Sequence, residues 1–172
     1  DDQGNAYGGG NNDLATAIEI GKRAAKHGLR VLLNFHYSDF WADPAKQQAP
    51  KAWEGLNIDD KANALYEFTK SAVDTMLSAG IDVGMGQLGN ETTGKMGGEH
   101  NWIRITQLMK AGSRAVREVS AAHNREILIA VHFTNPEKAG EYRRYGMILD
   151  NFEVYYDVFA SSYYPYWHGS LE

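Results

Sequence analysis

Four helical patterns alternate with four short apolar runs along this chain of 172 residues, and that alternation limits it to a few folds. Periodicity and capping residues predict helices over residues 14–25, 59–79, 101–123 and 136–149. Three apolar runs cover residues 29–35, 127–131 and 157–162, and a fourth leads from residue 81 to an Asn-Glu pair. Short continuous runs are typical of buried parallel strands. The alternation therefore indicates an α/β protein with a parallel sheet.

Capping residues indicate where these helices begin and end. Asn12 or Asp13 can cap the first helix with its side chain, and Gly28 can end it in the left-handed conformation. Asn135 followed by Pro136 predicts the start of the fourth helix, because Asn caps helices and Pro is favoured in the first turn.

Each predicted strand ends in a residue that can take part in chemistry: His36, Glu91, His132 and Tyr163. Ligand sites lie at the carboxyl ends of the strands in α/β barrels and in doubly wound sheets alike. A doubly wound sheet usually carries a Gly-rich phosphate-binding turn directly after a strand, and none of these strands is followed by one. We therefore predict a (β/α)8 barrel. Because such a barrel has eight strands in about 250 residues, residues 1–172 are expected to form one partial barrel domain, truncated at both ends.

Composition limits the possible partners. The net charge of −5 argues against nucleic-acid binding, which needs a concentrated basic face. No run approaches the roughly 20 apolar residues that span a bilayer, so no membrane partner is expected. The chain has no Cys, which excludes disulfides, thiolate nucleophiles and Cys-based zinc sites. It does not open with a signal-peptide pattern, so a mature, a cropped and a cytosolic chain all remain open.

The Asn90-Glu91 pair at the end of the second strand is the strongest candidate for catalysis. A carboxylate at a strand tip is held rigidly and can act as a general acid/base, and an Asn offers a donor and an acceptor to a hydroxyl-rich ligand. The alternative is a surface Glu in a helical turn beside a turn Asn. Glycosidase chemistry usually needs two carboxylates, and Glu91 is the only convincing one. Glu99 and Glu172 lie in polar, Gly-flanked segments and are expected to be solvated.

Other polar and aromatic residues follow the strands. His36 and His132 have no third ligand at diagnostic spacing, so we predict positioning of substrate or carboxylates and no metal site. Asp39 and Asp43 could bond sugar hydroxyls or fix their own loop. The rings of three residues could stack on sugar faces or pack loops onto the barrel: Trp41, Tyr166 and Trp167.

Four segments resemble the endo-β-1,4-galactanases of glycoside hydrolase family 53. Residues 36–44 (HYSDFWADP) resemble the signature after the third strand of that barrel, and residues 89–92 (GNET) resemble the acid/base segment after the fourth. Residues 131–137 (VHFTNPE) are similar to the segment after the fifth strand, and residues 156–169 (YDVFASSYYPYWHG) to that after the sixth. The likeness covers nearly the whole chain, in order, and is closest to bacterial, secreted members.

The resemblance implies a clan A barrel that cuts galactan side chains of pectin with retention of configuration. It implies that Glu91 is the acid/base and that Asn90 bonds the sugar 2-hydroxyl. The implied substrate-binding residues are His36, Asp39, Phe40, Trp41, Asp43, His132, Tyr163 and Trp167.

The nucleophile of that family is a second Glu after the seventh strand, which this chain does not reach, so the segment alone is expected to be inactive. Tyr163 is expected to hydrogen-bond that nucleophile. The calcium site of some bacterial members also lies in later loops, so no cofactor is expected here. Two alternatives remain: a non-catalytic or inactive sugar-binding barrel fragment, and a β-mannanase or cellulase of the same clan.

Overall fold

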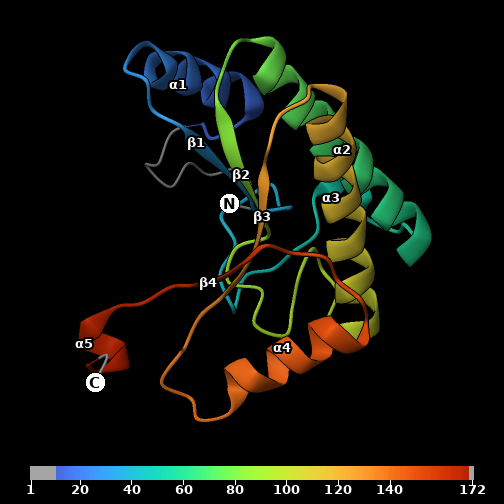
Figure 1. The fold of residues 1–172 in the computed structure, drawn as a ribbon. Coiled ribbons are helices and arrows are strands. Elements are labelled where there is room, and N and C mark those ends of the chain that lie inside the picture. Colours follow the sequence, from blue (N-terminus) through green and yellow to red (C-terminus); the bar gives the residue numbers. More distant parts are fainter. Residues whose placement is uncertain (1–10, 171–172) are drawn as a thin grey trace.

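A parallel sheet of four strands forms the centre of the computed structural model, which describes residues 11–170 (Figure 1). The Gly-rich residues 1–10 and Glu172 lie outside the described residues, so the prediction for Glu172 is not tested. The strands are β1 (Val31–Phe35), β2 (Val83–Leu88), β3 (Leu128–Phe133) and β4 (Val158–Ser161). The helices are α1 (Leu14–Lys26), the 3-10 helix η1 (Lys51–Trp53), α2 (Ile58–Ser78), α3 (Trp102–Ala122), α4 (Glu141–Asn151) and α5 (Pro165–His168).

The strands lie in the sheet in the same order as in the sequence, β1-β2-β3-β4, and every pair is parallel. A doubly wound sheet would reverse its strand order at a switch point. Continuous winding in one direction is instead the arrangement of a barrel. The register pairs Phe35 with Leu88, Leu88 with Val131, and Phe133 with Ser161. The carboxyl ends of all four strands therefore lie along one edge of the sheet.

Helices α2 and α3 cover one face of the sheet and supply most of the core (Figure 1). Their fully buried side chains include Leu65, Val73, Met76, Ile105, Leu108 and Met109. Gly112 lets α3 approach β2 closely, because a Cβ there would lie 2.9 Å from a methyl carbon of Leu88. The central strands β2 and β3 are buried almost throughout, as predicted. The edge strands β1 and β4 are less buried than their apolar runs predicted, because each has a neighbouring strand on one side only.

The residues predicted to begin and end the first helix are confirmed. Asp13 caps α1, since its carboxylate accepts a hydrogen bond from the backbone N–H of Thr16 at 2.9 Å. Gly28 follows the helix with φ +67°, the left-handed conformation predicted for it. None of the helices within residues 11–170 is long and apolar enough to cross a bilayer.

The predicted start of the fourth helix was wrong. Asn135 has φ +63°, whereas a capping residue has an extended backbone. Residues 136–140 form turns, in which the N–H of Lys138 donates to the carbonyl of Asn135. Helix α4 begins at Glu141, after Gly140. Asn tolerates the left-handed region better than most residues, so the same side chain that suits a cap also suits a turn.

The prediction that Glu99 is solvated was also wrong. Glu99 is 8% exposed, and its carboxylate binds Lys61 of α2 and Arg104 of α3, the latter at 3.2 Å. Burial alone would raise the pKa of Glu99, but the hydrogen bonds from Lys61 and Arg104 outweigh it and hold that pKa below its usual value. Lys61 is itself 7% exposed. This buried pair ties the loop between β2 and α3 to α2.

Replacing Glu99 by Gln is expected to lower the free energy of unfolding by about 3 to 5 kcal/mol, because the ammonium of Lys61 would stay buried without a counter-charge. Urea unfolding of the two proteins measures the difference. Glu67→Gln, an exposed position on the same helix as Lys61, is the control and should change stability by less than about 0.5 kcal/mol. Equal effects of the two substitutions would contradict a stabilising role for the buried pair.

Candidate active site

Glu91 lies at the carboxyl edge of the sheet in a left-handed backbone conformation, with φ +49°. The turn that carries it begins at Gly89, where φ is +83° and a Cβ would lie 2.4 Å from the methyl carbon of Thr92. A residue with a Cβ is disfavoured in this region by roughly 1–2 kcal/mol. Such strain persists only where surrounding contacts determine the backbone.

His132, at the end of β3, supplies several of those contacts. Its Nδ1 accepts a hydrogen bond from the backbone N–H of Glu91 at 3.0 Å, and its carbonyl accepts from the N–H of Thr92 at 2.9 Å and from the Thr92 hydroxyl at 3.0 Å. Since Nδ1 accepts, a neutral ring carries its proton on Nε2, which lies 3.1 Å from the Ser162 hydroxyl and can donate to it. Burial lowers the pKa of His132, and Glu91 opposes that effect. His132 is therefore a neutral ring that fixes the Glu91 turn.

Both polar atoms of the Asn90 side-chain amide are hydrogen-bonded. Its Nδ2 donates to the carbonyl of Ala42 at 2.8 Å, and its Oδ1 accepts from Nδ2 of Asn34 at 3.2 Å. Gln87 in turn donates to Oδ1 of Asn34 at 2.7 Å. Because an amide nitrogen has two N–H groups, Asn90 keeps one for a ligand.

Sequence reasoning missed Asn34, Gln87 and Ser162. A signal for the first two existed, since both are polar positions near the ends of otherwise apolar strands. They also face each other in the register of β1 and β2.

His36 lies on the other side of Glu91. Its Nδ1 accepts from the N–H of Ala42 at 2.7 Å, and its Nε2 lies 3.2 Å from Nδ2 of Asn34. Burial lowers the pKa of His36 as well, again opposed by Glu91, and His36 contributes to the lowered pKa of His132. The structure thus brings His36, Glu91 and His132 together. Within residues 11–170 there is no group of three or more His, Asp or Glu side chains that could hold a metal ion.

The two Asp residues after β1 bond to their own loop. Asp39 accepts from the N–H of Lys51 at 2.7 Å. Asp43 accepts from the N–H groups of Ala45 and Lys46 at 2.8 and 2.9 Å. These bonds support the loop-fixing alternative, and direct contact of either carboxylate with sugar stays a prediction.

The predicted stacking residues are largely open to solvent. Trp41 is 52% exposed, lies edge-on to Phe40, and has the ammonium of Lys46 4.4 Å from its ring centre. Trp167 is 72% exposed on α5, which Figure 1 shows set apart from the sheet. Tyr163 precedes α5, and its hydroxyl donates to the carbonyl of Gly169. Its expected bond to a nucleophile outside this chain stays a prediction.

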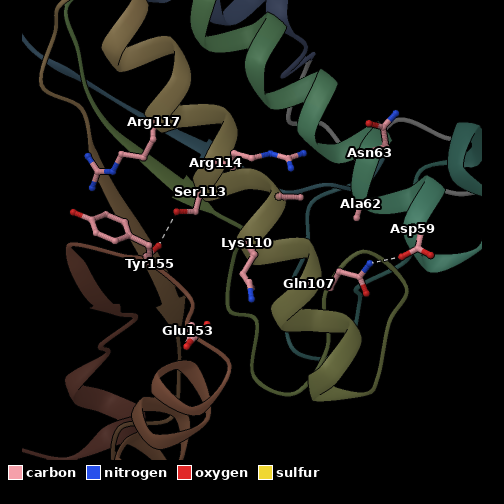
Figure 2. Close-up of a pocket in the computed structure, with 11 residues that line it drawn as sticks. Asp59, Ala62, Asn63, Gln107, Lys110, Ser113, Arg114, Arg117, Glu153 and Tyr155 are labelled. Atoms are coloured by element: carbon pink, nitrogen blue, oxygen red, sulfur yellow. Dashed lines mark hydrogen bonds between the residues drawn. The ribbon is translucent and has the colours of Figure 1, made fainter.

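A groove lies elsewhere, between α2, α3 and the segment that leads into β4 (Figure 2). It encloses about 610 Å³. Its polar side chains bond mainly within the chain: Ser113 to the carbonyl of Tyr155 at 2.8 Å, and Gln107 to Asp59 at 2.6 Å. The cations of α3 that line it point in different directions (Figure 2). The chemistry therefore places the candidate site at the strand ends, away from this groove.

Sequentially wound parallel strands, with a carboxylate and an amide held at their carboxyl ends, define a segment of a β/α barrel whose candidate site lies at the strand ends. The model of glycosyl hydrolase family 53 matches residues 1–172. The chain belongs to glycosyl hydrolase family 53.

Curated relatives and solved structures agree with this family. An endo-β-1,4-galactanase of Bacillus subtilis (strain 168) is 57% identical over all of this chain and 39% of its own length. An arabinogalactan endo-β-1,4-galactanase of Cellvibrio japonicus is 34% identical over 91% of this chain and 43% of its own. The family 53 catalytic domain of Ignisphaera aggregans superposes with a TM-score of 0.87 and 40% identity, over 99% of this chain and 47% of that one. The chain thus spans less than half the length of these relatives, and the predicted partial barrel is confirmed.

Acid is expected to lower the stability of the folded protein by protonating the imidazoles of His36 and His132. Their folded-state pKa values lie below the ordinary 6.5, so the stability that they contribute is complete above that pH and is lost as the pH falls through the folded pKa. The melting temperature should therefore fall between about pH 7.5 and about pH 5.5. His132→Asn should reduce this fall, whereas the exposed control His27→Asn should leave it unchanged. Parallel curves for all three proteins would contradict the neutral state of His132.

Proposed function

We propose that the protein to which this chain belongs is a retaining endo-β-1,4-galactanase and that Glu91 is its general acid/base. The observation that carries this proposal is the clamped Glu91 turn at the carboxyl edge of a family 53 barrel segment, with neutral His36 and His132 beside it. The names of the relatives, galactanase and arabinogalactan galactanase, support the substrate.

In this mechanism Glu91 donates a proton to the leaving glycosidic oxygen and then, as a carboxylate, activates the water that releases the product. A second carboxylate must lie about 5 to 5.5 Å away to form the glycosyl-enzyme intermediate. We propose that the rest of the barrel supplies it, so that residues 1–172 are one inactive part of a single catalytic domain. Asn90 donates its remaining amide N–H to the sugar 2-hydroxyl, a bond that strengthens towards the transition state.

The loops around this turn supply the subsites of the proposal. Trp41, which lies beside Phe40, and Trp167 present broad exposed rings to stack on galactose units. His36 and His132 position the substrate and the acid/base, and Tyr163 bonds the nucleophile. Asp39 and Asp43 shape the loop and can bond sugar hydroxyls from it. A polymeric galactan of pectin is too large to enter a cell intact, so we propose an extracellular, secreted enzyme.

Replacing Glu91 by Gln in the full-length enzyme is expected to lower the release of reducing sugar from galactan by about a hundredfold to ten-thousandfold, since general acid catalysis contributes that much. An aryl galactoside with a good leaving group should lose far less in its first step, because that step needs little proton donation. Glu126→Gln, an exposed carboxylate just before β3 at the opposite edge of the sheet, is the control and should keep full activity. Comparable activity of the Glu91 variant and the wild type would refute the assignment.

A polysaccharide panel tests the substrate. The full-length enzyme should degrade pectic galactan to short oligosaccharides and leave β-mannan and cellulose intact. Cleavage of mannan or cellulose in preference to galactan would move the protein to another activity of the clan. Galactan binding without cleavage would indicate a sugar-binding module.

A further inference from the structure

Both ends of the peptide unit that joins Asn90 to Glu91 are held by side chains. Its carbonyl accepts a hydrogen bond from Nε2 of Gln47 at 2.8 Å. Its N–H donates to Nδ1 of His132 at 3.0 Å. Gln47 comes from the loop after β1 and His132 from the end of β3, so the unit is clamped from the two strands that flank β2.

The orientation of this unit determines the backbone angle φ of Glu91, because φ is the rotation about the bond from the Glu91 nitrogen to its Cα. That angle is +49°, a value disfavoured for a residue with a Cβ. Without the clamp, rotation of the peptide plane would return Glu91 to a common conformation and move its carboxyl group. Two side-chain hydrogen bonds therefore act directly on the torsion that aims the carboxylate.

Gln47 is well fixed for such a role. It is 5% exposed, so it is shielded from any ligand in solution. Its own carbonyl accepts from the N–H of Gly98 at 2.6 Å, which joins the loop after β1 to the loop after β2. The Asp43–Lys46 bridge orders the residues just before it.

The orientation of the Gln47 amide follows from its surroundings. Its Oε1 is buried and has no hydrogen-bond partner among residues 11–170. A flipped amide would set Oε1 against the carbonyl of Asn90, which would place two acceptors together. A buried polar atom without a partner calls for an explanation. Here the explanation is the hydrogen bond that Nε2 donates to the carbonyl of Asn90, because this bond fixes the amide with Oε1 on the side that offers no donor.

We propose that Gln47 is a positioning residue of the catalytic site: together with His132 it clamps the Asn90–Glu91 peptide and so sets the direction of the Glu91 carboxyl group. The proposal rests on the proposed function, in which Glu91 exchanges the proton. Gln47 acts only through the main chain and touches neither substrate nor reacting atoms.

The test compares Gln47→Met and Gln47→Glu in the full-length enzyme with Gln48→Met and Gln48→Glu, matched changes at the exposed neighbouring residue. Gln47→Met should lower kcat on galactan about tenfold to a hundredfold, as expected of a displaced catalytic group, with KM within about threefold because Gln47 touches no substrate. In Gln47→Glu the introduced carboxyl group donates to Asn90 only when protonated. The ratio of its kcat to that of wild type should therefore fall as the pH rises, because the effects of groups that both enzymes share cancel in this ratio. The Gln48 variants should match wild type.

A measurement without substrate separates this proposal from the proposed function. Hydrogen exchange of the Glu91 backbone N–H should be about tenfold faster or more in Gln47→Met and unchanged in Gln48→Met. An inactive wild type would overturn the galactanase assignment, and the exchange rates would still decide the role of Gln47. Unchanged kcat and exchange in both Gln47 variants would overturn the clamp. A rise in KM alone, or a lower melting temperature with unchanged kcat, would overturn it as well.

Discussion

The hydrogen bonds between His132 and the main chain at Glu91 and Thr92 are the interactions on which the arrangement of the site depends. They hold the end of β2 against the end of β3. Asn34 and Gln87 make the matching connection between β1 and β2. Neighbouring strand ends are thus joined by side chains as well as by the sheet itself. The carboxylate sits on a turn that neither strand could hold alone.

Burial favours the neutral form of both histidines at this edge of the sheet. Each imidazole faces a backbone N–H through its Nδ1, so each must stay neutral to accept that bond. The lowered pKa values of His36 and His132 have the same origin, since desolvation disfavours the charged ring. The nearby carboxylate pulls in the opposite direction without prevailing. The two rings therefore serve as rigid supports of the Glu91 turn, and in the proposed mechanism they compete little with Glu91 for its proton.

Local patterns predicted the alternation, the parallel sheet, the first helix with its ends, and the residues at the strand ends. The failures share a physical cause. Asn135 suits a turn and a cap equally well, and only the path of the chain selects one. Glu99 sits among glycines that suggest solvent, yet the loop folds it onto Lys61, a residue 38 positions away. Gln47 looks like an ordinary loop residue, because its partner Asn90 is distant in sequence. Contacts between loops cannot be read from periodicity.

The short helix α5 has a consequence for how such enzymes can diverge. Its segment is bonded mainly within itself, through Tyr163 to Gly169 and Tyr164 to His168, and its rings project into solvent. The turn at Glu91 is secured by other residues. In the proposed enzyme, insertions or substitutions near Tyr166 and Trp167 would therefore alter contacts with the substrate and leave the hydrogen bonds of the Glu91 turn in place. The fold thus keeps the segment that carries these exposed rings separate from the contacts that fix Glu91.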